Sequence, residues 1–189
     1  VIEYARLLLA QANNIRALAA NLQKNHDGEL RIATTHTQAR YALPLALSAF
    51  NQQFPNIAVH LSPGSDAESL MQLDRDQADI AIISTANPQA PHGYTALPIY
   101  RWDRVGILAE MAYGATDSDL VRIDANTLLP QCTTWLLLRK DRLQRNYTLD
   151  LIHRLIPSLH SIDLQRLLRH NQAITFNTPH WSNTTQPGT

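Results

Sequence analysis

Neutral hydrogen-bonding side chains are concentrated in one stretch, Thr34-Thr35-His36-Thr37-Gln38. An apolar alternating run, Leu30 to Ala33, precedes it and is typical of a strand. Apolar residues then recur at steps of four, three and four, which indicates one face of a helix: Leu43, Leu47, Phe50 and Phe54. The polar stretch therefore lies where a strand ends and a helix begins, which is where open α/β sheets place their ligand crevices. Unpaired N–H groups and the positive end of the helix dipole make an anion the natural guest there.

The candidate donors in this stretch are Thr35, Thr37 and Gln38, which offer hydrogen bonds without adding charge. The same residue types also cap helices and pair with loop backbone in proteins that bind nothing. On spacing alone, both interpretations stay open.

An alternation of strands and helices has to position these residues. Ser65 and Glu68 have the spacing of a capping box, and Pro44 either occupies the first position of its helix or divides that helix in two. Such an alternation predicts an α/β sheet with right-handed crossovers, and the continuous apolar run 79–84 predicts a strand buried on both faces of a parallel sheet. The strands are expected at 30–34, 57–61 and 79–84, with helices at about 36–54 and 66–77 between them.

The second half of the chain is less regular. Pro-rich residues 87–93 predict a loop, and residues from 171 onward predict a disordered or loosely docked tail, opened by a weak helical pattern after Ser161. Strands are expected at 97–102, 120–124 and 133–138, and a helix at about 143–159.

Residues 1 to about 24 predict one long helix without Gly or Pro. Large residues repeat every seven positions beside small ones, a pattern that lets two helices approach closely: Val1, Leu8, Ile15 and Leu22, with Ala5, Ala12 and Ala19. A surface helix lying on its own domain is the alternative, and we favour a partner helix.

Composition describes an ordinary globular protein, with 44% apolar residues and 16 basic against 16 acidic side chains. This neutral balance gives no support for a nucleic-acid-binding face. No apolar run has membrane-spanning length, the first residues lack a signal-peptide layout, and a single cysteine excludes an internal disulfide. We therefore expect a cytoplasmic location and no membrane partner.

Motifs for catalysis, metals and cofactors are missing from the sequence. The eight histidines are scattered without ligand spacing, and no Ser/His/Asp, Gly-x-Ser-x-Gly or phosphate-binding glycine motif is present. Cys132 is expected to be a buried small hydrophobe, and Tyr100-Arg101-Trp102 to be a strand rather than a base-stacking patch. We expect a protein that is not an enzyme and that uses no cofactor and no metal.

Three segments resemble LysR-type transcriptional regulators, and most closely their sulfur-assimilation (CysB/Cbl) branch. They are Gly28–Pro44, Ala78–Ile82 and Leu97–Trp102, of which the first is specific to that branch and the second is general to the family. Leu120–Ala125 and the final strand and helix also resemble that branch. The resemblance implies a periplasmic-binding-protein-like (Rossmann-like) α/β regulatory subdomain preceded by a long linker helix.

The resemblance also implies a site. In that branch the Thr and Gln residues of the first segment bind the effector anion, and so does the residue after the buried third strand. The matching positions are Thr35, Thr37, Gln38 and Ser84, and Ser84 keeps a hydroxyl where the branch has Thr. We predict that Thr35→Ala combined with Gln38→Ala abolishes effector binding and leaves thermal unfolding nearly unchanged.

The sequence departs from the family pattern in two places. No helix-turn-helix precedes the linker helix, so DNA would be reached only through a domain absent from this chain. At a seam near Arg104–Val105 most of the second regulatory subdomain, which forms the opposite wall of the cleft, is expected to be missing. The expected division is a linker and dimerisation helix at 1–26, a first subdomain at 29–104, a return segment at 105–160 and a tail at 161–189.

The implied function is the effector-sensing and oligomerisation part of a CysB-like activator of sulfur and cysteine metabolism. The expected partners are a small effector (sulfate, thiosulfate or an acetylserine-like molecule) and further copies of the chain, as a dimer or tetramer. An effector-less module that only pairs with other regulator subunits is the alternative. A transport-type solute-binding protein shares the architecture, but the linker helix and the lack of a signal count against it.

Overall fold

A five-stranded sheet forms the centre of the computed structural model, which describes residues 2–22, 27–85, 93–102, 104–105, 109–110, 131–142, 144–170 and 178–179. The strands lie in the order β2-β1-β3-β7-β4. Their bounds are β1 Gly28–Thr35, β2 Ile57–Gly64, β3 Ile80–Thr85, β4 Tyr94–Trp102 and β7 Cys132–Arg139. A separate short pair consists of β5 Arg104–Val105 and β6 Ala109–Glu110.

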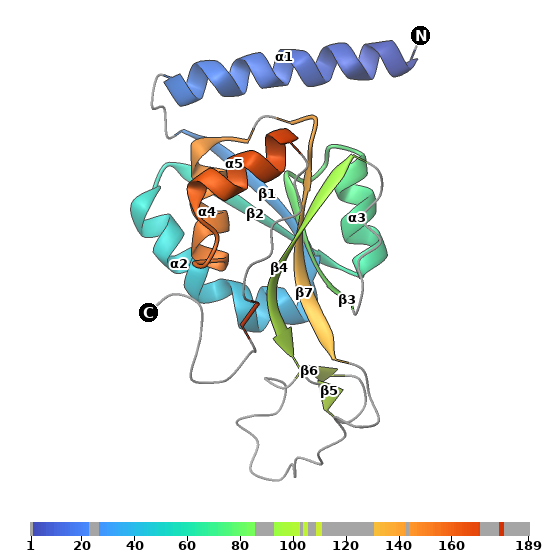
Figure 1. The fold of residues 1–189 in the computed structure, drawn as a ribbon, viewed down its shortest axis with the longest axis vertical. Coiled ribbons are helices and arrows are strands. Elements are labelled where there is room, and N and C mark those ends of the chain that lie inside the picture. Colours follow the sequence, from blue (N-terminus) through green and yellow to red (C-terminus); the bar gives the residue numbers. More distant parts are fainter. Residues whose placement is uncertain are drawn as a thin grey trace.

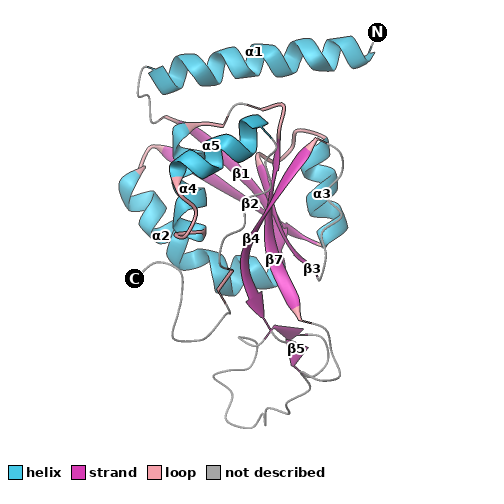
Figure 2. Ribbon diagram, viewed as in Figure 1, coloured by secondary structure: helices cyan, strands magenta, loops and turns pink. Residues whose placement is uncertain are grey.

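Helices cover both faces of this sheet (Figure 1). On one face lie η1 Gln38–Ala42, α2 Leu43–Gln53, α4 Asn146–Leu155 and α5 Ser161–His170, and on the other lies α3 Asp66–Asp74. The remaining helix, α1 Ile2–Leu22, crosses one end of the molecule, outside these layers (Figure 2). The expected α/β fold with a long preceding helix is confirmed.

The sheet is mixed, which corrects the expectation of parallel pairing around the third strand. β1 pairs in parallel with β2 and with β3, as the βαβ rhythm predicts. β7 then pairs antiparallel with both β3 and β4. The burial of β3 on both faces is confirmed, because Ile80 to Ile83 are all buried. Its second neighbour in the sheet is β7, and the paired residues Ser84 and Thr134 are 50 positions apart in the sequence. A sequence pattern reports burial and cannot report the direction of the strand that supplies it.

The helix after β1 contains an irregularity that resolves the question about Pro44. Residues 38–42 form a π-turn, and Pro44 occupies the second position of the α-helix that follows. Proline has no N–H to donate and its ring clashes with the carbonyl four residues earlier, so a regular α-helix through this point would be strained. The π-turn relieves that conflict, and such turns are frequent at functional sites.

Local signals elsewhere predicted the helices correctly but not always their bounds. The capping box of Ser65 and Glu68 is present, and α3 ends at Asp74, before the expected Gln77. One helix was expected at 143–159, and α4 covers only Asn146–Leu155. Cys132 is fully buried, as expected.

The start of the predicted tail is part of the fold, because Leu164 and Leu167 of α5 are buried in the main core. Of the other expectations, the strand at 120–124 and the tail at 171–177 and 180–189 lie outside the described residues, as does the loop at 87–93 apart from Gly93.

Candidate functional site

Gln38 lies at the centre of a polar cluster on the face of the sheet that packs against α2 and α4. Its side chain is fully buried, and its Nε2 donates to Ser84 Oγ at 2.9 Å and to Thr134 Oγ1 at 3.0 Å. The hydroxyl of Tyr100 donates to Gln38 Oε1, and the Ser84 and Thr134 hydroxyls are 3.3 Å apart. We call Gln38, Ser84, Tyr100 and Thr134 the Gln38 cluster.

The sheet brings this cluster together from four distant parts of the chain. Ser84 lies at the end of β3 and Thr134 at the start of β7, and the two are directly paired in the antiparallel register. Tyr100 of β4 pairs with Thr134 from the other side. Gln38 enters from the π-turn that follows β1. The insertion of β7 between β3 and β4 is therefore what completes the cluster.

Two of the four predicted site residues, Gln38 and Ser84, are in direct contact. Thr35 is connected more weakly, because its Oγ1 accepts only a long hydrogen bond of 3.4 Å from the backbone N–H of Gln38. Thr37 is half-buried and shows no hydrogen bond of its side chain within the described part of the chain. The structure thus gives Gln38 and Ser84 internal partners and leaves Thr37 available.

Sequence reasoning did not select Thr134 and Tyr100. Tyr100 and Trp102 are buried in the core, which supports the strand interpretation over a base-stacking patch. Thr134 carries no local signal, since it becomes a neighbour of Gln38 only through the pairing of β7 with β3.

Two buried donors beside the cluster have no partner. Thr34 Oγ1 and Trp102 Nε1 are buried without a hydrogen-bond partner in the described segments. Thr34 follows the core residue Ile32 by two positions on β1, so it belongs to the same face of the sheet. Trp102 is itself part of the hydrophobic core on that face, which also carries Gln38. A buried donor left unpaired costs about 1–3 kcal/mol, so such groups usually meet water or a ligand.

One carboxylate lies close to the cluster. Asp66 accepts a 3.2 Å hydrogen bond from the Ser84 amide, and its half-burial raises its pKa, although the Ser84 N–H partly offsets that effect. An anion at the Ser84 amide would therefore have to displace Asp66 or meet it in its protonated form. The other donors of the cluster belong to neutral side chains, which suits a polar ligand bound through hydrogen bonds.

Within the described ranges, no group of three or more His, Cys, Asp and Glu side chains could hold a metal ion. None of the described helices has both the length and the apolar character needed to cross a membrane.

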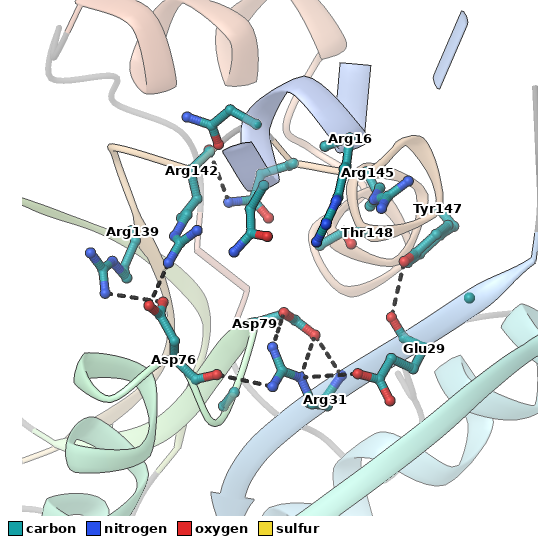
Figure 3. A pocket seen from close by; sticks show the side chains of 16 residues that line it. Arg16, Glu29, Arg31, Asp76, Asp79, Arg139, Arg142, Arg145, Tyr147 and Thr148 are labelled. Carbon is teal, nitrogen blue, oxygen red and sulfur yellow. Dashed lines mark hydrogen bonds and ion pairs between the residues drawn. The ribbon is translucent and has the colours of Figure 1, made fainter. Parts of the chain in front are cut away.

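A cavity of about 470 Å³ lies elsewhere, between α1 and the start of β1, and is lined by arginines and carboxylates (Figure 3). Glu29 lines it, six residues before Thr35 on the same strand, so about 20 Å of β1 separates the cavity from the predicted site. Nothing in the sequence analysis pointed to it, because its lining residues are scattered over four segments of the chain.

Comparisons with known proteins give a matching family model and relatives among transcriptional regulators. Residues 23–111 match the family model described as LysR substrate binding domain. The CysB regulator of Haemophilus influenzae is 26% identical, with 92% of this chain and 76% of the relative covered. The Cbl regulator of Escherichia coli is 28% identical, with 76% and 68% covered.

A solved structure, the cofactor-binding domain of the Cbl transcriptional regulator, superposes with a TM-score of 0.69 at 23% identity. It covers 77% of this chain and 95% of the other, so this comparison supports the fold. Residues 23–111 thus match a LysR substrate binding domain, the chain is a relative of the CysB and Cbl regulators, and the solved Cbl domain shares its fold.

Proposed function

We propose that this chain is the effector-sensing part of a CysB-like regulator of sulfur metabolism and that it binds a small effector at the Gln38 cluster. The observation that carries the proposal is the set of buried donors where β1, β3, β4 and β7 meet. Gln38, Ser84 and Thr134 are held together there, and Thr34 and Trp102 add donors without partners among the described residues.

The donor set favours sulfate, thiosulfate or an acetylserine-like molecule over an apolar ligand. Hydroxyl, amide and indole groups can hold a desolvated oxyanion by dipoles alone. The carboxylate of Asp66 opposes a dianion directly at Ser84, so we place the charged end of the ligand towards Thr37 and the first turn of the helix.

A second function is favoured by the same contacts. The Gln38 amide already has Ser84, Thr134 and Tyr100 as partners, so the cluster is satisfied without a ligand. A chain whose Gln38 cluster needs no ligand would act as an effector-less module that pairs with other regulator subunits through α1.

Burial of Gln38 also changes the expectation for the double variant with Thr35. Removing a fully buried side chain with three hydrogen-bonded partners destabilises the fold, so lost binding by Thr35→Ala with Gln38→Ala would not isolate the site. Thr37 is the better position to test, because its hydroxyl makes no contact on which the described structure depends.

We expect Thr37→Ala to weaken sulfate binding about tenfold, the loss of one charge-assisted hydrogen bond, with little change in the melting temperature. Isothermal calorimetry with sulfate and with acetylserine measures the affinity. Ser48→Ala, which removes an exposed hydroxyl from α2, is the control and should bind as the parent chain does. Equal affinity in both variants would place the effector elsewhere, and no heat with either ligand would favour the pairing module.

A further inference from the structure

We call the cavity under α1 the α1 pocket. It lies between the linker helix and the body of the molecule, and both contribute residues to its lining. Arg16 reaches it from α1, Glu29 and Arg31 from the start of β1, and Arg142 and Arg145 from the segment between β7 and α4 (Figure 3). The pocket lies at the end of the sheet opposite the Gln38 cluster, so it is a separate site.

Its lining carries an excess of positive charge. Five arginines face three carboxylates of the lining: Arg16, Arg31, Arg139, Arg142 and Arg145 against Glu29, Asp76 and Asp79. Asp141, just outside the lining, also pairs with Arg139 at 2.7 Å, so the arginines still exceed the carboxylates by one. Three of the arginines are paired within this set. Arg31 is 2.9 Å from Asp79, Arg139 is 3.1 Å from Asp76, and Arg142 also pairs with Asp76.

The side chains of the two remaining arginines, Arg16 and Arg145, form no ion pair or hydrogen bond with any described residue. Figure 3 shows Arg16 extending from α1 into the pocket, with Arg145 near it on the body side. The Nε of Arg142 is buried in the same region and has no acceptor among the described residues. Donors from both walls of the pocket are therefore available to one guest.

The backbone adds to this supply of donors. α4 starts at Asn146 beside the pocket, and the first-turn amides of Tyr147 and Thr148 have no acceptor in the described structure. A helix start favours negative charge through its free N–H groups and its dipole. It reinforces a site that the arginines already define.

We propose that the α1 pocket binds a small dianion with a phosphate-like or sulfate-like group, held between Arg16 of α1 and Arg142 and Arg145 of the body. Guanidinium groups bind such oxyanions through paired hydrogen bonds, and the two guanidinium groups without partners, those of Arg16 and Arg145, match the charge of a dianion. Because the guest contacts both walls, it binds more tightly when α1 is docked than when α1 has moved away. Bound anion thus fixes the position of the linker helix.

Calorimetry with inorganic phosphate at constant ionic strength tests the binding. We expect Arg16→Gln combined with Arg145→Gln to weaken phosphate binding at least tenfold. Arg166→Gln, an exposed arginine on α5, should leave it unchanged. Thr37→Ala should also leave it unchanged, which separates this pocket from the Gln38 cluster. Equal affinity in the parent chain and the double variant would overturn the proposal.

A second variant is expected to tighten phosphate binding, a result that loss of folding could not produce. Asp76 has φ 58°, a left-handed conformation that Asn also tolerates, so Asp76→Asn removes one negative charge from the lining with little backbone strain. We expect it to tighten phosphate binding several-fold, and unchanged or weaker binding would contradict the charge argument.

Hydrogen exchange tests the link to the helix. Phosphate should slow exchange of the α1 amides in the parent chain and leave exchange unchanged in the Arg16→Gln, Arg145→Gln variant. Phosphate that binds without slowing exchange in α1 would refute the clamping of the linker helix.

Discussion

At the scale of single residues, Gln38 has both a structural and a proposed functional role. Its side-chain amide connects the ends of β3 and β4 and the start of β7 through Ser84, Tyr100 and Thr134. A ligand that reaches Gln38 must replace one of these internal bonds, so part of the binding energy is used to open the cluster. The Thr37 side chain has no hydrogen-bond partner in the described structure, so it can bind a ligand without breaking an internal bond.

Replacing Gln38 by Leu should lower the free energy of unfolding by about 2 kcal/mol or more, because buried hydroxyls lose their partner. Urea unfolding followed by circular dichroism measures the change. Gln52→Leu, on the exposed side of α2, is the matched control and should differ from the parent chain by less than about 0.5 kcal/mol. Equal stability of the two variants would show that the cluster does not support the fold.

At the scale of elements, α1 presents two chemically different faces. Its small and amide side chains face the body: Ala10 and Ala17 are buried, and Asn14 and Asn21 bond to backbone near α4. The side-chain oxygen of Asn21 accepts the N–H of Asn146, the first residue of α4. Since Arg145 at the cap position supplies no side-chain bond, α1 provides the cap for α4 from a distance of 125 residues in the chain.

Replacing Asn21 by Ala removes this cap and one docking bond of α1. We expect a loss of about 1–2 kcal/mol in unfolding free energy, measured by urea titration. Asn13→Ala on the exposed part of the same helix tests for a mere change in helix propensity. A similar loss in both variants would contradict the capping role.

At the scale of the whole molecule, the structure leaves apolar surface uncovered on α1. Leu8, Ile15 and Leu22 of the heptad are 70%, 68% and 76% exposed, and Tyr4 and Leu18 lie on the same seam. Contiguous exposed apolar surface of this kind marks interaction sites. It supports the proposal that α1 pairs with a second copy of the chain.

We expect Leu8→Glu combined with Ile15→Glu to reduce self-association, measured by light scattering across a concentration series. The melting temperature at the lowest concentration should stay close to that of the parent chain, because neither side chain packs on the body. Leu45→Glu, an exposed leucine on α2, is the control. Unchanged association in the double variant would assign pairing to another surface.

The alignment with the Haemophilus influenzae CysB regulator bears on the proposed second wall of the cleft. That alignment spans 247 positions and this chain has 189 residues, so at least 58 aligned positions have no counterpart here. The gap supports the proposal that most of a second subdomain is missing. With one wall only, the Gln38 cluster would hold its ligand less tightly than a closed cleft does.

Local physics made much of this protein predictable from its sequence. Periodicity predicted β1, β2 and β3 with α2 and α3 between them, and the capping box of Ser65 and Glu68 marked the start of α3. The position of Gln38 at a strand-to-helix junction followed from the same patterns. These features depend on neighbours within a few residues, whose side-chain spacing is visible in the sequence.

Only the tertiary structure decided the contacts between distant segments. The antiparallel insertion of β7 placed Thr134 and Tyr100 on Gln38, and the docking of α1 created the pocket around Arg16 and Arg145. Hydrogen bonds and charges depend on distances of a few ångströms between side chains. Residues separated by about a hundred positions reach such distances only through the packing of the whole fold, which no local pattern records.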